Sequence, residues 1–156
     1  MLTVTRKIMI SAPKESVRLY LRDLKNMQDY EQKVAQVVDV SYPDENSGFA
    51  ELEGRFFGLP WRGSFKMEFT RDGGFRSEMT KGPLKKATGG FHLRPVTGGT
   101  VVTHDEHYQF PFLMKPLAWA ARGWLARSLE LELGVIKEGA ERLHRQLQIR
   151  QIETAL

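Results

Sequence analysis

The chain has 156 residues, of which 41% are hydrophobic and 27% charged, a composition that excludes a disordered polymer and a membrane-embedded bundle. It has no cysteine, which excludes a disulfide framework and a thiolate metal site. The net charge of +4 is spread along the chain without a run of Lys or Arg, so we do not expect a nucleic-acid partner.

The N-terminal part of the chain predicts one strand followed by two short helices. We expect a strand from Leu2 to Ile10, and the early proline and acidic residue of the segment 11–15 are typical of a helix start. A second short helix is expected from Leu24 to Tyr30. The apolar positions with helical spacing between these points are Val17, Tyr20, Leu21 and Leu24.

The first residues also bear on the location of the protein. Arg6 and Lys7 interrupt the apolar run that a signal peptide needs, so we expect no such leader. No stretch approaches the roughly 18 consecutive apolar residues of a transmembrane helix. Together with the lack of cysteine, these features favour a cytoplasmic protein.

The middle of the chain predicts an antiparallel sheet. Apolar and polar residues alternate over 50–56, 61–69 and 75–79, and because successive strand side chains point to opposite faces, each run has one apolar face. Short turn signals such as Asp72-Gly73-Gly74 and Gly98-Gly99 separate the runs and favour hairpins. With the opening strand, we count seven strands.

The last part of the chain predicts one long helix that starts near Pro116. Glycines at 123, 134 and 139 on this helix either leave room for a ligand or allow close packing. A sheet with one apolar face needs a cover, and this helix is the only element long enough to supply it. Its apolar stripe consists of Leu117, Ala121, Trp124, Leu125, Leu129, Leu133, Ile136, Ala140, Leu143 and Leu147.

The expected fold is therefore α+β. A curved, seven-stranded antiparallel sheet wraps the long C-terminal helix, and two short helices follow the first strand. We expect residues 1–156 to form a single ligand-binding domain, with an apolar space between sheet and helix.

Two stretches, together with the long terminal helix, resemble the START-like (SRPBCC) superfamily, the helix-grip proteins that include polyketide cyclases, dehydrases and lipid-transport proteins. The first is "ISAPKESVRLYLRDLKNMQDYEQKVAQVVDV", a strand, a helix and a Val-rich strand. The second is "GPLKKATGGFHLRPVTGGTVVTHDEHYQF", similar to the last hairpin of that family. The resemblance covers almost the whole chain and implies the helix-grip fold. Because members range from lipid, sterol and quinone binders to aromatase/cyclases, the fold does not select one function.

The last hairpin predicts which side chains face the enclosed space. A two-residue turn at Gly98-Gly99 would place Leu93 opposite His104 and Phe91 opposite Glu106, and opposed residues share a face. His104 and Glu106 would then lie among aromatic side chains, where an ionised carboxylate needs a partner. Two interpretations stay open: the pair lies at a wet mouth or outside, or it provides polar anchors in an apolar pocket.

The predicted ligand-binding residues share the inner face of the sheet or the apolar stripe of the helix. They either fill the core unaided or line a cavity for a hydrophobic small molecule. The set is Leu52, Phe56, Trp61, Phe65, Met67, Phe69, Phe75, Ser77, Met79, Phe91, Leu93, Val102, His104, Glu106, Tyr108, Trp124 and Leu125.

Apolar loop tips predict a rim around the cavity mouth. The segments "RFFGLPWRG" and "FPFLMKPLAWAARGW" are unusual because loops normally face water. They either close against each other or make a transient contact with a membrane surface. In the second case, the residues near anionic headgroups would be Lys85, Lys86, Lys115 and Arg122.

No stand-alone catalytic motif occurs: GxSxG, a phosphate-binding glycine loop and a dinucleotide fingerprint are all missing. His104 and His107 fall on opposite faces of a strand, so we expect no metal site, and no cofactor is expected. The favoured function is binding or transport of a hydrophobic molecule such as a lipid, quinone or polyketide. The alternatives are a cyclase or dehydratase, with His104 as general acid or base and Glu106 and Tyr108 orienting it, and a START-like protein-interaction module. The oligomeric state stays open.

Overall fold

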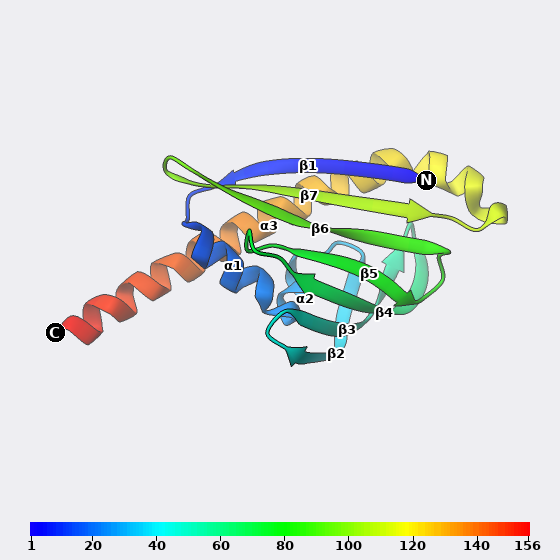
Figure 1. Ribbon diagram of the computed structural model, residues 1–156. Helices are drawn as coiled ribbons and strands as arrows, with labels where there is room; N and C mark the ends of the chain where they lie inside the picture. The colour runs from blue at the N-terminus through cyan, green and yellow to red at the C-terminus, as the bar shows by residue number, and fades with distance from the viewer.

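The computed structural model describes residues 1–156, and its elements follow the predicted order (Figure 1). The helices are α1 (Lys14–Arg22), the 3₁₀ helix η1 (Leu24–Asn26), α2 (Met27–Tyr30), the 3₁₀ helix η2 (Phe112–Met114) and α3 (Lys115–Ala155). The strands are β1 (Leu2–Ile10), β2 (Val34–Asp44), β3 (Ser47–Phe56), β4 (Leu59–Phe69), β5 (Phe75–Lys81), β6 (Lys86–Val96) and β7 (Gly99–Gln109).

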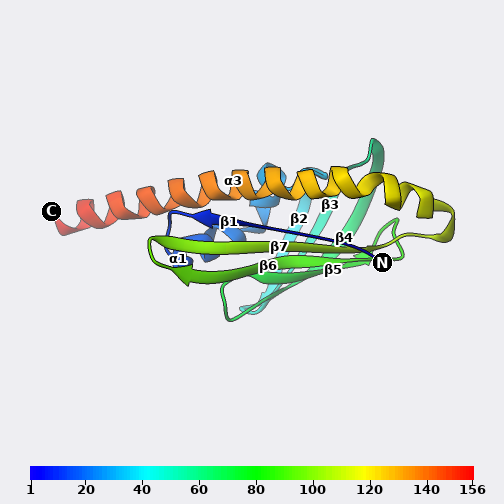
Figure 2. The same cartoon turned by 90° about the horizontal axis from the view of Figure 1, so that it is seen from above.

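The seven strands form one sheet in the order β1-β7-β6-β5-β4-β3-β2, and every neighbouring pair is antiparallel. Register shifts in β2 interrupt its ladder with β3, as β-bulges do where a strand bends. Helix α3 runs over one face of the sheet, and the C-terminal part of the helix extends beyond the sheet (Figure 2). The α+β helix-grip fold predicted from the sequence is confirmed.

The core consists of two apolar clusters separated by polar residues. Along α3, Leu129 belongs to one cluster and Leu133 to the other, with the buried Glu132 between them. Along β7, Val102 and Tyr108 are divided in the same way, with His104 and Glu106 between them. The polar residues therefore form a layer across the interior between sheet and helix.

The register of the last hairpin differs from the prediction by two residues. The turn is Thr97-Gly98, because Gly98 has a φ of +84°, a left-handed conformation that glycine adopts without strain. Phe91 pairs with His104, not with Glu106, and Leu93 pairs with Val102, not with His104. A two-residue shift leaves each side chain on the same face, so the predicted inner face is correct.

The three glycines of α3 have different surroundings. A Cβ atom at Gly139 would lie 2.4 Å from Cε2 of Tyr20, so this glycine allows α3 to pack closely on α1. Gly123 and Gly134 have no neighbour within 4 Å of a Cβ. None of the helices combines the length and the apolar character needed to cross a bilayer.

Candidate functional site

A cavity of about 210 Å³ lies between the sheet and the helices. We call the lining residues at or beside the connections the cavity rim: Leu59 and Pro60 at the start of β4, Pro83 and Leu84 in the β5–β6 loop, and Met114 at the end of η2. From the predicted set, the residues that border it are Leu52, Phe56, Trp61, Phe65, Met67, Phe75, Ser77, Met79, Phe91, His104, Glu106 and Tyr108.

Five residues of the predicted set lie away from the cavity: Phe69, Leu93, Val102, Trp124 and Leu125. Leu93 and Val102 are buried in the cluster that contains Val17 and Leu21 of α1. Leu125 is fully buried in the cluster that contains Leu2 and Val4 of β1.

The other two lie at edges of the core. The Phe69 ring stacks on Tyr42, with centroids 6.3 Å apart. Trp124 packs edge-on against Phe56, with centroids 5.3 Å apart, and also contacts Phe57. The sequence therefore predicted which side chains point into the protein, but not which of them border the cavity.

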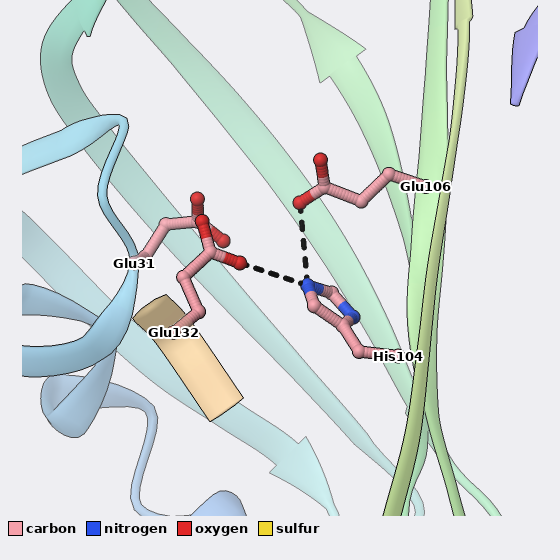
Figure 3. Close-up of side chains that lie close together, drawn as sticks. All are labelled: Glu31, His104, Glu106 and Glu132. Atoms are coloured by element: carbon pink, nitrogen blue, oxygen red, sulfur yellow. Dashed lines mark hydrogen bonds and ion pairs between the residues drawn. The ribbon is translucent and has the colours of Figure 1, made fainter. Parts of the chain in front are cut away.

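Four ionisable side chains of the cavity lining contact one another and the buried Glu132 of α3. We call these five residues the polar cluster: Glu31, Lys33, His104, Glu106 and Glu132. Glu31 and Lys33 lie in the connection from α2 to β2, His104 and Glu106 on β7, and Glu132 on α3. Figure 3 shows the carboxyl groups of Glu106 and Glu132 both pointing to one nitrogen of the His104 ring, with the Glu31 carboxyl beside that of Glu132. His104, Glu106 and Glu132 are 3%, 6% and 0% exposed, so charges in the cluster depend on one another rather than on water.

His104 faces hydrogen-bond acceptors at both ring nitrogens. Its Nδ1 lies 2.8 Å from the carbonyl oxygen of Gly90, and its Nε2 lies 3.0 Å from Glu132 Oε2 and 3.3 Å from Glu106 Oε1. Both nitrogens must carry a proton to donate these bonds, so the ring is an imidazolium. Burial alone would lower the pKa of His104, but the bonds to Glu106 and Glu132 outweigh it and raise that pKa to about 10.

Lys33 places its ammonium among three carboxyl groups. Its Nζ lies 2.5 Å from Glu31 Oε1, 2.7 Å from Glu132 Oε1 and 3.1 Å from Glu106 Oε1. Burial disfavours the charged forms, yet Lys33 and His104 lower the pKa of Glu132 to about 2. Burial likewise opposes ionisation of Glu106, and Lys33 again outweighs it and lowers the pKa of that carboxyl. Both glutamates are therefore carboxylates.

Glu31 behaves in the opposite way. Burial raises the pKa of its carboxyl well above the ordinary value, and the Glu132 carboxylate raises it further. With Glu31 protonated, the two cations Lys33 and His104 balance the two anions Glu106 and Glu132, and the polar cluster is neutral. The hydroxyl of Tyr108 donates to Glu106 Oε2 and completes the shell of that carboxylate.

The polar cluster also contains metal-ligand chemistry that the sequence did not suggest. Donor atoms of Glu31, His104, Glu106 and Glu132 lie within 4.8 Å of one another, and imidazole with carboxylates suits several divalent cations. However, the Lys33 ammonium lies among the same oxygens, and the His104 nitrogen that would bind a metal carries a proton. A cation would have to displace both, so the expected absence of a metal stays a prediction.

Sequence reasoning missed Glu31, Lys33 and Glu132. A signal for Glu132 existed, because it follows Leu129 by three residues and precedes Ile136 by four, which places it on the apolar stripe of the helix. Glu31 and Lys33 lie in a connection with no periodicity, and no local pattern indicates that their side chains point into the protein.

Comparison with known proteins agrees with this architecture. The family described as "Polyketide cyclase / dehydrase and lipid transport" matches residues 1–148. A solved structure from Thermus thermophilus superposes with a TM-score of 0.78 at 19% identity, covering 88% of this chain and 96% of the other. No curated protein matches the sequence.

Two other similar structures carry functional descriptions. The Zhui aromatase/cyclase from Streptomyces sp. R1128 has a TM-score of 0.72 at 14% identity, covering 90% of this chain and 93% of the other. A STAR-related lipid transfer protein from Xanthomonas axonopodis has a TM-score of 0.67 at 16% identity, covering 87% and 84%. At these identities the likeness shows the shared fold.

Proposed function

The chain belongs to the polyketide cyclase/dehydrase and lipid transport family, and we propose that it binds and carries a compact hydrophobic molecule in the cavity between the sheet and α3. The observation that carries this proposal is an apolar cavity of about 210 Å³ that ends in a charge-balanced polar cluster. Small-molecule sites generally have this form, a largely apolar wall with a few placed polar groups, and typical volumes of roughly 300–1,000 Å³. The smaller volume here favours a single fused-ring system or a short chain.

Half-buried apolar side chains support an open cavity rather than a self-filled core. Phe56, Trp61, Phe65 and Met79 border the cavity on the inner face of the sheet, yet none of them is fully buried. Covering this apolar surface with a ligand would contribute roughly 25 cal/mol for each Å² removed from water.

The chemistry of the polar cluster favours ligand binding over catalysis. In particular, it argues against the catalytic roles predicted for His104, Glu106 and Tyr108. The protons of His104 and Tyr108 are donated to Glu106 and Glu132, so His104 cannot act as a general base. A cyclase or dehydratase in this fold would instead use the protonated carboxyl of Glu31 as its general acid.

Extraction of the purified protein tests the proposal. Native mass spectrometry should detect a copurifying apolar molecule that organic solvent removes. Ser77→Phe, which fills the cavity, should abolish this mass. Glu78→Phe adds a ring at the next residue, on the outer face, and should leave it unchanged. A protein that never carries or rebinds an apolar molecule would contradict the proposal.

We also propose that the cavity rim contacts anionic membrane surfaces. Phe112, Leu113 and Trp119 are 79%, 90% and 85% exposed, although large apolar side chains seldom cluster on a free surface. Phe112 and Trp119 share a surface hollow with Lys85, Lys115 and Arg122.

Charge distribution supports this partner. Residues 79–104 and 110–129 contain no Asp or Glu. All the exposed charged residues in these two segments, which contribute to the rim, are therefore Lys or Arg. Basic side chains near an anionic surface each contribute about 1 kcal/mol of attraction. In the other rim segment, Phe56 and Phe57 pack on Trp124, while Leu59 stays exposed.

Liposome co-sedimentation tests the rim. The protein should sediment with vesicles that contain phosphatidylserine and much less with neutral phosphatidylcholine vesicles. Replacing Phe112, Leu113 and Trp119 together by Ser should abolish sedimentation. The matched control replaces Ile149 and Ile152, which are also exposed but lie far along α3, and should sediment normally. Absence of sedimentation with either vesicle would refute the membrane proposal.

A further inference from the structure

The polar end of the cavity holds one buried hydroxyl without a partner. Tyr30 is 1% exposed and borders the cavity, yet its Oη makes no hydrogen bond. An unpaired buried donor costs about 1–3 kcal/mol, so such groups normally have a partner in the working state of a protein. The Tyr30 hydroxyl is therefore a candidate contact for a bound molecule.

Neighbouring rings hold Tyr30 in place. Phe91 meets it edge-on with centroids 5.8 Å apart, and Tyr20 lies 6.2 Å away on a tilted plane. Because these rings are themselves buried, the Tyr30 ring is not free to turn its hydroxyl toward another part of the protein. Burial raises the pKa of Tyr30 well above its ordinary value, so the hydroxyl keeps its proton and can donate it.

Glu31, next to Tyr30 in the chain, has a carboxyl oxygen that makes an ion pair but no hydrogen bond. Its Oε1 lies 2.5 Å from Lys33 Nζ, but the alignment is not that of a hydrogen bond, and this oxygen has no hydrogen-bond partner. Glu31 also borders the cavity. The cavity lining thus contains a phenol without a partner and, next to it in the chain, a carboxyl oxygen whose only polar contact is the Lys33 ammonium.

The other charges of the polar cluster are already committed. The Lys33 ammonium is surrounded by three carboxyl groups, and His104 donates to Gly90 and to Glu132. A ligand with a carboxylate or phosphate would bring a further negative charge beside Glu106 and Glu132 without a free cation to meet it. Burying an ionised group in that way is costly, whereas an uncharged oxygen loses little.

We infer that the cavity selects apolar molecules that carry an uncharged oxygen group, a carbonyl or a hydroxyl, and rejects those that end in a carboxylate or a phosphate. Tyr30 donates a hydrogen bond to this oxygen, and the polar cluster, whose cations are already paired, excludes anions. The inference rests on the proposed binding function and adds the chemical class of the ligand.

Four naphthalene probes with one ring system test the inference: 2-naphthol, 2-acetylnaphthalene, 2-methylnaphthalene and 2-naphthoate. Affinities are measured at pH 7 by isothermal titration calorimetry on the full chain after removal of any bound molecule. We expect 2-naphthol and 2-acetylnaphthalene to bind at least about tenfold tighter than 2-naphthoate, as expected for an unpaired buried charge. Methylnaphthalene should fall between them.

Two matched variants test whether the Tyr30 hydroxyl is the group that causes the preference for 2-naphthol. Tyr30→Phe should remove the preference for 2-naphthol over 2-methylnaphthalene and leave thermal stability equal or higher, because the lost hydroxyl has no partner. Tyr20→Phe removes a hydroxyl outside the cavity lining and should keep the preference.

The outcomes separate the two proposals. If 2-naphthoate binds as tightly as 2-naphthol, or if Tyr30→Phe keeps the full preference for 2-naphthol, the inference is wrong while the binding function stands. If none of the four probes binds, 2-methylnaphthalene included, the binding function itself fails and the inference fails with it.

Discussion

Glu31 and Glu132 have the same side chain and lie in the same cluster, but they differ in charge because they face different groups. Glu132 accepts from His104 and Lys33 and is 0% exposed, so its negative charge is compensated on two sides. Glu31 contacts one cation, Lys33, and meets the Glu132 carboxylate as well. The protonation state of a buried residue thus depends on its neighbours more than on its type.

This difference predicts that the same Glu→Gln substitution has a large effect at position 132 and a small effect at position 31. Glu132→Gln removes a charge that two buried cations need, so the free energy of unfolding should fall by about 3–5 kcal/mol. Glu31→Gln replaces one neutral group by another of the same shape and should change it by less than about 1 kcal/mol. Urea denaturation at pH 7 measures both. Equal losses in the two variants would show that Glu31 is ionised in the folded protein.

His104 makes stability depend on pH in an alkaline window. Because the folded protein raises its pKa from 6.5 to about 10, the stabilisation is fully present below pH 6.5 and is lost as the pH rises toward 10. The difference in unfolding free energy between the protein and His104→Gln should therefore be constant at lower pH and shrink between pH 6.5 and 10. Denaturation curves across this range measure it, and a difference that stays constant would contradict the ion-paired imidazolium.

At the scale of elements, the position of α3 decides where space remains. Ala121, Leu125 and Leu129 pack in the same cluster as Leu2 and Val4 of β1, which closes that side of the sheet. Farther along, Ile136 and Ala140 join the cluster that contains α1. The cavity lies over β3 to β7, where neither helix covers the inner face completely.

The packing of α3 on α1 predicts opposite effects for two glycine substitutions. Gly139→Ala would bring a methyl group to 2.4 Å from the Tyr20 ring, and overpacking of this kind costs about 1–3 kcal/mol. Gly134→Ala meets no neighbour within 4 Å and should stabilise the helix by up to about 1 kcal/mol. Thermal unfolding of the two variants provides the measurement. A stabilising Gly139→Ala would mean that Tyr20 moves aside freely.

In the molecule as a whole, the basic rim lies at the entrance of the apolar cavity, and the polar cluster lies inside it. The rim residue Met114 borders the cavity, and Phe112 and Lys115 beside it belong to the exposed hollow. A ligand that entered from a membrane surface would therefore meet apolar side chains before the polar cluster. This arrangement fits a carrier.

Ligand removal should lower the stability of the whole domain. A molecule that binds only the folded state at 100 times its Kd stabilises that state by about 2.7 kcal/mol. For a chain of this length, this corresponds to a loss of roughly 5–10 °C in Tm after solvent extraction. Scanning calorimetry before and after extraction, and again after adding the ligand back, measures it. The cavity-filled Ser77→Phe should show no such change.

Sequence patterns by themselves determined the order of the elements, the antiparallel sheet and its inner face. Alternation with period two and helical spacing are local properties, so Leu52, Phe65 and Phe91 could be assigned inward without a structure. Even a two-residue error in the register of the last hairpin did not change those assignments.

The content of the interior depends on contacts between residues that are far apart in the chain. The polar cluster joins Glu31 and Lys33 to His104 and Glu132, which are about 70 to 100 residues away along the chain. Their protonation states follow from distances of 2.5–3.3 Å that no sequence period encodes. The cavity, likewise, is the part of the inner face that α1 and α3 leave uncovered, and this depends on how whole elements cross the sheet.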